Sequence, residues 1–373
     1  MPIDVVIPLY EGGRWIEETL ASVFAQGDML GEVVVVDDAS TDDGPERVRA
    51  LGERVRLIPS AGKLRTRQTG LLATTSPRVA FLDQDDIWHP RHLELLSQAM
   101  DRNPTAPAAA GRALHFRSGE PPLHEIAAGP DEAFAPWDVW PWACPVISPS
   151  AVLFDREALR DVGGWSPDPT PDWQVYLRLG LRAPLVRISS ATCAYRLHAT
   201  SHSSSMQRDG VIYLEKMSRG AEASYAERLV DETDPATREN LTMRLERFQT
   251  FDRFVRALGR DDVPAAQAEA RVLEAGLPRD PRGDATTLFA LAQYLVCPMG
   301  DPAEFDASRR RLLDRAQAAI PEDLPQLHRA FVVLPRRRRF RWRRVVRHTL
   351  KGRWKDARLL LAQRREEIRA AKG

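Results

Sequence analysis

The chain has 373 residues, of which 43% are hydrophobic and 28% charged, and its formal net charge is +1. This length allows two domains, each with its own core. No apolar run approaches the roughly 20 residues that a membrane-spanning helix needs, and Met1-Pro2-Ile3-Asp4 leads into a predicted strand without the features of a signal peptide. We therefore expect a cytoplasmic protein. The cysteines, Cys144, Cys193 and Cys297, fit a reducing compartment and exclude a structural zinc site.

The N-terminal half alternates predicted strands with predicted helices. Strands are expected at residues 4–9, 33–36, 55–58 and 79–82, with helices around residues 16–24, up to residue 48 and at about 64–73 between them. This order favours a parallel, doubly wound α/β sheet, in which ligands bind at the carboxyl ends of the strands. Neither G-x-G-x-x-G nor G-x-x-x-x-G-K-[ST] occurs, which disfavours a dinucleotide-binding fold and a P-loop.

Three of these strands end in polar residues, which we expect to meet in one crevice: Tyr10, Asp38 and Asp85. The Tyr10 ring can stack on a base, and the Asp38 carboxylate can accept a hydrogen bond from a base N–H. Arg67, on the helix before the fourth strand, can pair with a diphosphate or with the base edge. Taken singly, the three side chains also fit a core aromatic, a helix-capping turn and a solvated helix face.

The fourth strand ends in Asp83-Gln84-Asp85-Asp86, which places three carboxylates within four positions. Like charges this close raise one another's pKa unless a cation lies among them. Mg²⁺ or Mn²⁺, which prefer oxygen ligands, would neutralise them and keep coordination positions open for a diphosphate. The alternative is an acidic turn that caps the helix after His89-Pro90.

Several segments follow one another in a characteristic order: residues 5–10 (VVIPLY), 35–42 (VVDDASTD), 67–70 (RQTG), 81–86 (FLDQDD), 150–165 (ending in GGW) and 171–179 (beginning PDW). Together they resemble the motifs of family 2 glycosyltransferases over about residues 3–205. The resemblance implies a GT-A fold, with a Rossmann-like, mostly parallel sheet in the N-terminal domain.

The resemblance also implies roles for individual residues. Asp172 would be the catalytic base, Asp85 the direct metal ligand, and the nucleotide would be bound by Pro8, Tyr10, Glu11, Asp38, Arg67 and Asp83. Two positions depart from the family pattern, because Pro171 stands where the family has Glu and Gln68 where it has Asn. The proline removes a carboxylate that often contributes to the acceptor site.

Residues 195–201 (YRLHATS) resemble the family's segment after the last strand of the domain. His198 can ligate the metal or contact the diphosphate, and Arg196 can neutralise a phosphate. Residues 201–205 are polar enough for a lid over the donor. A surface loop with a solvated histidine is the alternative.

These parts predict a metal-dependent, inverting transfer of a sugar from a nucleoside-diphosphate sugar, with a UDP-sugar as the foremost candidate. One carboxylate, Asp172, would accept the proton of the attacking hydroxyl; an N-cap is the alternative role. The acceptor would be a glycan or a lipid-linked glycan in cell-surface polysaccharide synthesis. A non-catalytic sugar-nucleotide-binding or assembly protein with the same fold is the alternative, and a nucleotidyltransferase is a weaker third.

Residues 118–149 interrupt the pattern and contain three tryptophans within six residues. Aromatic rings stack on the C–H faces of sugars, so we assign Trp140, together with Trp173, to acceptor binding. Local core packing is the alternative for this segment.

The C-terminal part is predicted to be helical. Asp234-Pro235 opens a helix that ends at Gly259, and further helices are expected at about 264–275, 284–296 and 302–319. The expected domains are a transferase domain at 1–210, an all-α module at 211–335 and a basic tail at 336–373.

The tail carries 16 Lys or Arg residues against three acids, interleaved with Phe340 and Trp342. This composition fits an anionic membrane surface, so we expect a peripheral protein at the inner face of the membrane. A solvated tail is one alternative and nucleic acid another, but no nucleic-acid-binding fold accompanies the tail, so we expect no nucleic acid partner.

Overall fold

The structure is a computed structural model that describes residues 1–62, 65–134, 146, 148–166, 171–198, 210–276 and 314–328. The chain divides into two compact units, one of residues 1–138 with 145–197 and the other of residues 139–144 with 198–373. Trp140, the predicted lid, the predicted helix at 284–296, the start of the one at 302–319 and the basic tail lie outside the described residues. The predicted domain boundaries stay predictions.

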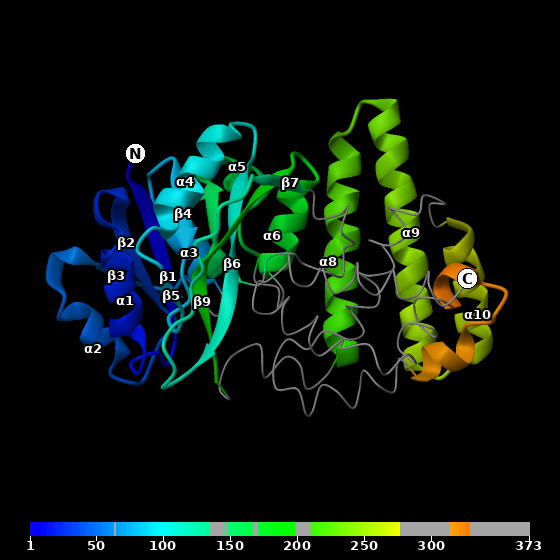
Figure 1. The fold of residues 1–373 in the computed structure, drawn as a ribbon, viewed down its shortest axis with the longest axis horizontal. Coiled ribbons are helices and arrows are strands. Elements are labelled where there is room, and N and C mark those ends of the chain that lie inside the picture. Colours follow the sequence, from blue (N-terminus) through cyan, green and yellow to red (C-terminus); the bar gives the residue numbers. More distant parts are fainter. Residues whose placement is uncertain are drawn as a thin grey trace. The chain divides into compact units, whose positions relative to one another are not determined.

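Within the described part of the first unit, the strands form one sheet (Figure 1). This sheet has nine strands in the order β3-β2-β1-β4-β8-β6-β9-β5, with β7 paired to β9. The first four are β1 (Ile3–Leu9), β2 (Leu30–Asp37), β3 (Arg56–Pro59) and β4 (Arg78–Phe81). They are parallel neighbours, as predicted. The α/β fold class is confirmed.

The rest of the sheet is mixed. It consists of β5 (Ile87–Trp88), β6 (Ala108–Arg117), β7 (Glu132–Phe134), β8 (Val152–Asp155) and β9 (Leu185–Leu197). Strand β8 lies antiparallel between β4 and β6, whereas β6 and β9 are parallel. The doubly wound parallel arrangement therefore holds for the first four strands and ends where β8 joins them.

Helices of the first unit are α1 (Ile16–Phe24), α2 (Gly44–Arg49), α3 (Thr66–Ala73), α4 (His92–Arg102), α5 (Arg156–Asp161) and α6 (Pro171–Gly180). Among the described residues of this unit, short 3-10 turns occur at Gly27–Met29, Gly52–Arg54 and Pro149–Ala151. The core forms as the apolar pattern predicts: the four consecutive valines 33–36 of β2 are buried, as are Ile16, Leu20 and Val23 of α1. Continuous burial of this kind is typical of a strand covered on both faces.

The amino-terminal edge of the sheet is tied together by Asp4, which is 2% exposed. Its carboxylate accepts hydrogen bonds from the backbone of Glu32 (3.0 Å), Thr75 (2.9 Å) and Ser76 (2.8 Å), and from the Ser76 hydroxyl (2.8 Å). Burial alone would raise the pKa of Asp4, but these hydrogen bonds outweigh it and lower the pKa. One ionised side chain thereby joins β1 to the start of β2 and to the turn before β4.

In the second unit the regular elements of the described residues are helices: α8 (Gly210–Asp231), α9 (Pro235–Gly259), α10 (Val263–Gly276) and α13 (Pro325–His328), together with helical residues 314–319. The side chain of Asp234 caps α9, as the sequence predicts, and Phe248, Phe251 and Leu258 are buried. Helix α9 packs against both α8 and α10. No helix in the described part of the chain is both long enough and apolar enough to cross a membrane.

Candidate functional site

The carboxyl ends of β1, β2 and β4 meet at one edge of the sheet. The Asp38 N–H donates to the Leu9 carbonyl (2.8 Å), which joins the end of β2 to the end of β1. The side-chain amide of Gln84 accepts from the Tyr10 N–H and donates to the Tyr10 carbonyl, both at 2.7 Å. The structure therefore brings together the three strand ends that the sequence predicts to converge.

Tyr10 is 59% exposed at this edge. A ring this open is available for stacking on a base, and the alternative of a core aromatic is wrong. Pro8 and Asp38 are half-buried, Pro8 within β1 and Asp38 directly after β2.

The loops after β1 and β2 are fastened to each other by Glu11. Its carboxylate accepts from the backbone N–H of Thr41 (2.7 Å) and from the Thr41 hydroxyl (2.9 Å), and its own N–H donates to Ser40 Oγ (3.2 Å). Glu11 and Ala39 both have positive φ angles, 51° and 64°. Such conformations persist only where the surroundings enforce them. Glu11 thus shapes the edge of the site, and its contact with a nucleotide stays a prediction.

Residues 83–86 form a tight acidic turn, in which the Asp86 N–H donates to the Asp83 carbonyl (3.0 Å). The Asp83 N–H donates to Ser150 Oγ (3.0 Å), and the Asp83 carboxylate pairs with Arg67. Asp86 is 1% exposed; burial raises the pKa of its carboxyl well above its usual value, and the charges of Asp85 and Asp83 raise it further. The turn therefore crowds three carboxyl groups at the edge of the sheet, and this crowding favours the protonated form of Asp86.

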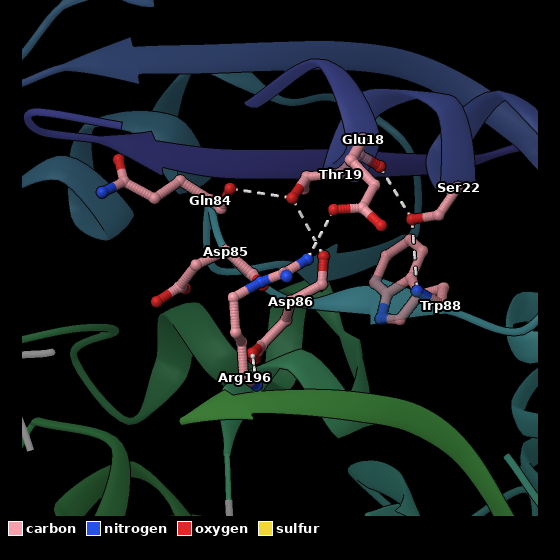
Figure 2. A network of polar contacts seen from close by, with 8 residues as sticks. All are labelled: Glu18, Thr19, Ser22, Gln84, Asp85, Asp86, Trp88 and Arg196. Carbon is pink, nitrogen blue, oxygen red and sulfur yellow. Dashed lines mark hydrogen bonds and ion pairs between the residues drawn. The ribbon is translucent and has the colours of Figure 1, made fainter. Parts of the chain in front are cut away.

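The carboxylate of Asp85 is directed away from Thr19 and Arg196, which hold the other side of the turn (Figure 2). Among the described residues, no group of three or more His, Cys, Asp or Glu side chains is arranged to hold a metal ion. A cation at Asp85 would have to complete its coordination with oxygens from water and from a ligand. This fits Mg²⁺, which commonly binds through one or two carboxylates together with substrate phosphates.

Arg67 links the acidic turn to Asp172. Burial lowers the pKa of the Arg67 guanidinium, but the charges of Asp83 and Asp172 outweigh it and raise the pKa. Conversely, burial raises the pKa of the Asp172 carboxyl and the charge of Arg67 opposes that rise. The predicted base and the first carboxylate of the acidic turn thus interact with the same guanidinium. Arg67 does not lie on a solvated helix face, which was the alternative for it.

The two glycines before Trp165 shape the segment beside Arg67. Gly163 and Gly164 have φ angles of 82° and 63°, which other residues rarely adopt. Gln68 Oε1 accepts a hydrogen bond from the Trp165 N–H (2.8 Å), and the Arg67 guanidinium carbon lies 5.4 Å from the centre of the Trp165 ring. Gln68, at the position where the family has Asn, therefore anchors this segment to α3.

The structure places the remaining predicted residues as follows. Trp173 is only 6% exposed, so its ring is largely buried, and its contact with the acceptor stays a prediction. His198 is half-buried and directly follows β9, and its metal contact stays a prediction. Arg196 is 4% exposed and pairs with Glu18 (2.6 Å). This arrangement differs from the phosphate contact expected from the sequence.

Sequence reasoning missed the side chains that hold the site in place: Glu18, Thr19, Gln84 and Ser150. Thr19 offered a signal, since it is a polar residue among the buried positions of α1 and is itself fully buried. Gln84 lies between two predicted ligands but was not itself assigned a role.

Residues 4–163 match the family model described as Glycosyl transferase family 2. ExoW, a succinoglycan biosynthesis protein of Rhizobium meliloti, is 39% identical over 109 residues, 27% of this chain and 34% of that protein. The Escherichia coli protein WfgD, a UDP-Glc:alpha-D-GlcNAc-diphosphoundecaprenol beta-1,3-glucosyltransferase, is 30% identical over 105 residues, 27% of this chain and 42% of that protein. The chain thus spans well under two thirds of each relative.

Among solved structures, the chain is similar to S. aureus TarS 1-349 in complex with UDP-GlcNAc. The TM-score is 0.53 at 17% sequence identity, and the match covers 86% of this chain and 90% of that one. A likeness at this identity shows the fold alone. It confirms the GT-A fold predicted for this chain.

Proposed function

Because the N-terminal part of this chain, residues 4–163, belongs to glycosyl transferase family 2, we propose that the protein transfers a sugar from a nucleoside-diphosphate sugar to a hydroxyl acceptor with inversion. The observation that carries this proposal is that Arg67 interacts with both Asp83 and Asp172. If Asp83 serves the donor and Asp172 the acceptor, the two carboxylates would be coupled through this one guanidinium. A single base without a second carboxylate nucleophile implies one displacement at the anomeric carbon.

The donor end of the proposed site is the edge formed by β1, β2 and β4. The exposed Tyr10 ring would stack on the base, and Asp38 would accept from a base N–H. A UDP-sugar is the donor that we propose first. The relative WfgD is named for UDP-Glc, and the TarS structure holds UDP-GlcNAc.

For the cation we propose Mg²⁺ or Mn²⁺ held by Asp85, with His198 as a further ligand. The donor set fits, because the acidic turn offers hard oxygen ligands, and a bound cation would relieve the repulsion between carboxylates that raises the pKa of Asp86. When bound, the ion would neutralise the charge that develops on the departing diphosphate.

Asp172 would act as the base. Its carboxyl has a raised pKa because of burial, which makes it a better proton acceptor than an exposed aspartate, while Arg67 favours its ionised form. The packing of α6 fixes its position, since Trp173, Tyr176 and Leu179 are buried. A raised pKa and a fixed orientation support the role of Asp172 as the base.

The acceptor class that we propose is a glycan or a lipid-linked glycan in polysaccharide synthesis. The names of two relatives point this way, one a succinoglycan biosynthesis protein and the other acting on a diphosphoundecaprenol-linked sugar. Trp140 remains the proposed acceptor contact, and the basic tail remains the proposed contact with an anionic membrane surface at the cytoplasmic face.

The test is to measure release of nucleoside diphosphate from a panel of nucleotide sugars with Mn²⁺, first without acceptor and then with lipid-linked glycans. Donor turnover by the wild type, abolished in Asp172→Asn, is the expected result. Donor binding with no turnover under any of these conditions would favour the alternative, a non-catalytic sugar-nucleotide-binding or assembly protein. Pro171, which replaces a carboxylate of the family pattern, leaves room for that alternative.

A further inference from the structure

The acidic turn is held from its inner side by side chains that belong to none of the proposed ligand contacts. Thr19 Oγ1, on α1, lies 2.7 Å from the Gln84 carbonyl and 3.0 Å from the Asp86 carbonyl, so its single proton serves both. Arg196 Nε, on β9, donates to the Asp85 carbonyl at 2.7 Å. Three consecutive carbonyls of the turn are therefore fixed by two side chains (Figure 2).

Arg196 holds the turn through further contacts. Its backbone N–H donates to Asp86 Oδ1 (3.0 Å), and its Nη2 donates to Glu18 Oε2 (2.6 Å). Its guanidinium carbon lies 4.5 Å from the centre of the Phe116 ring. Burying a guanidinium is costly unless it is paired and hydrogen-bonded, so these partners determine where the guanidinium of Arg196 lies.

We propose that Arg196, oriented by Glu18, is a positioning residue that fixes the backbone of the acidic turn and thereby aims the Asp85 carboxylate at the cation of the donor. This inference rests on the proposed function. It replaces the expectation that Arg196 neutralises a phosphate. A side chain that is 4% exposed and directed at a carbonyl and at Glu18 has little surface left for a diphosphate.

Glu18 distinguishes the two roles. If Arg196 bound phosphate directly, removal of the Glu18 charge would leave donor binding unchanged or improve it. If Arg196 positions the turn, the same change loosens the guanidinium and weakens binding. Glu17 is a matched control, because it is the neighbouring residue on α1 and pairs with Arg47 at the same 2.6 Å.

The experiment measures calorimetric binding of UDP to the full chain, with Mn²⁺ and with EDTA, for wild type, Arg196→Lys, Glu18→Gln and Glu17→Gln. We expect Arg196→Lys to weaken binding with Mn²⁺ about tenfold, as expected for a lost hydrogen bond to a charged donor. Glu18→Gln should weaken it about two- to fivefold, because this partner is solvent-accessible. Glu17→Gln should match wild type, and binding in EDTA should change little in all four proteins.

A second readout does not depend on the ligand. Amide hydrogen exchange in a peptide spanning residues 82–88 should be faster in Arg196→Lys and Glu18→Gln than in Glu17→Gln. Equal loss of UDP affinity with Mn²⁺ and with EDTA, or unchanged exchange in this peptide, would overturn the positioning role. Glu18→Gln, at a half-exposed position, keeps the test decisive if Arg196→Lys does not fold.

A failure of the proposed function gives a different result from a failure of the positioning role. If the wild type binds neither UDP nor any other nucleoside diphosphate with Mn²⁺, the donor assignment fails. The exchange comparison then decides by itself whether Arg196 fastens the turn.

Discussion

Gln84 and Tyr10 hold each other through two reciprocal hydrogen bonds, each 2.7 Å long. The side-chain amide of Gln84 bonds both the N–H and the carbonyl of Tyr10, as the backbone of a neighbouring strand would. It thereby joins the acidic turn to the loop that carries the exposed tyrosine. Gln84→Glu removes the donor of this pair and places a negative oxygen against the Tyr10 carbonyl. We expect UDP binding to weaken about five- to tenfold.

Isothermal calorimetry with UDP and Mn²⁺ measures this effect. Gln98→Glu is the control, since Gln98 is an exposed residue of α4 whose side chain donates a hydrogen bond to Glu94 on the surface (3.1 Å). Equal affinities for the two variants would show that the Gln84–Tyr10 pair does not shape the nucleotide site.

Asp172→Asn should abolish transfer while leaving the binding of UDP and Mn²⁺ within about twofold of wild type. The amide keeps the shape of the side chain but cannot accept the acceptor proton. A rate loss of about 10²-fold or more is expected, the usual contribution of general-base catalysis. Single-turnover kinetics with a saturating donor measures it. Parallel loss of donor binding would assign Asp172 to structure instead.

Arg67→Gln should move the acidic limb of the pH profile of kcat to higher pH. The base must be deprotonated to work, and Arg67 lowers the pKa of Asp172, so removing the guanidinium raises that pKa further. The donor KM should also rise, because Arg67 pairs with Asp83. Arg91→Gln, which breaks an exposed pair with Glu94, serves as the control. A pH profile that keeps its acidic limb would separate Arg67 from the base.

The sequence predicted which edge of the sheet carries the candidate site, because parallel strands place their carboxyl ends together whatever the detail of the loops. Tyr10, Asp38 and Asp85 follow from that rule. The hydrogen bonds that hold the acidic turn could not be predicted in this way. Residue spacing does not reveal that the Thr19 hydroxyl donates to a backbone carbonyl at the end of a strand more than sixty residues away. The antiparallel position of β8 between β4 and β6 was missed for a similar reason, since β8 is far from both strands in the sequence. Helix α8 was also missed.

Buried histidines should make the first unit sensitive to acid. Burial lowers the pKa of His92 to about 3 and that of His115 to about 4. An unfolded histidine has a pKa of about 6.5, so between that pH and about 4 the unfolded state binds protons that the folded state does not. The free energy of unfolding should therefore fall as the pH drops through this window, by up to about 1.4 kcal/mol per pH unit for each histidine.

Urea denaturation at pH 7, 6 and 5 measures this dependence. His92→Gln removes one of the two groups, and its stability should depend less steeply on pH than that of the wild type. The ring of His92 stacks on Trp88 and its Nδ1 contacts the Thr192 hydroxyl (2.8 Å), so the variant should also be less stable at pH 7. An unchanged slope would show that the folded state binds a proton at His92 as readily as the unfolded state does.

Gly164→Ala should destabilise the protein by about 1–3 kcal/mol, from the strained φ and the crowded Cβ. A Cβ at this position would lie 2.3 Å from Gln68 Oε1, the atom that anchors Trp165. Gly259→Ala is the control, because a Cβ there meets no atom within 4 Å and the φ angle is not positive. Chemical denaturation of both variants measures the difference. Equal stabilities would mean that the Gly163-Gly164 turn can rearrange at little cost.

Asp4 lies at the amino-terminal edge of the sheet, at the opposite ends of β1, β2 and β4 from Tyr10, Asp38 and the acidic turn. The contacts that hold the scaffold and the proposed ligand site therefore lie at opposite ends of the same strands. Such a division lets the loops of one edge acquire new specificities while the other keeps the architecture, and it makes Asp4 a poor target, and the loops a good one, for redesigning what this protein recognises.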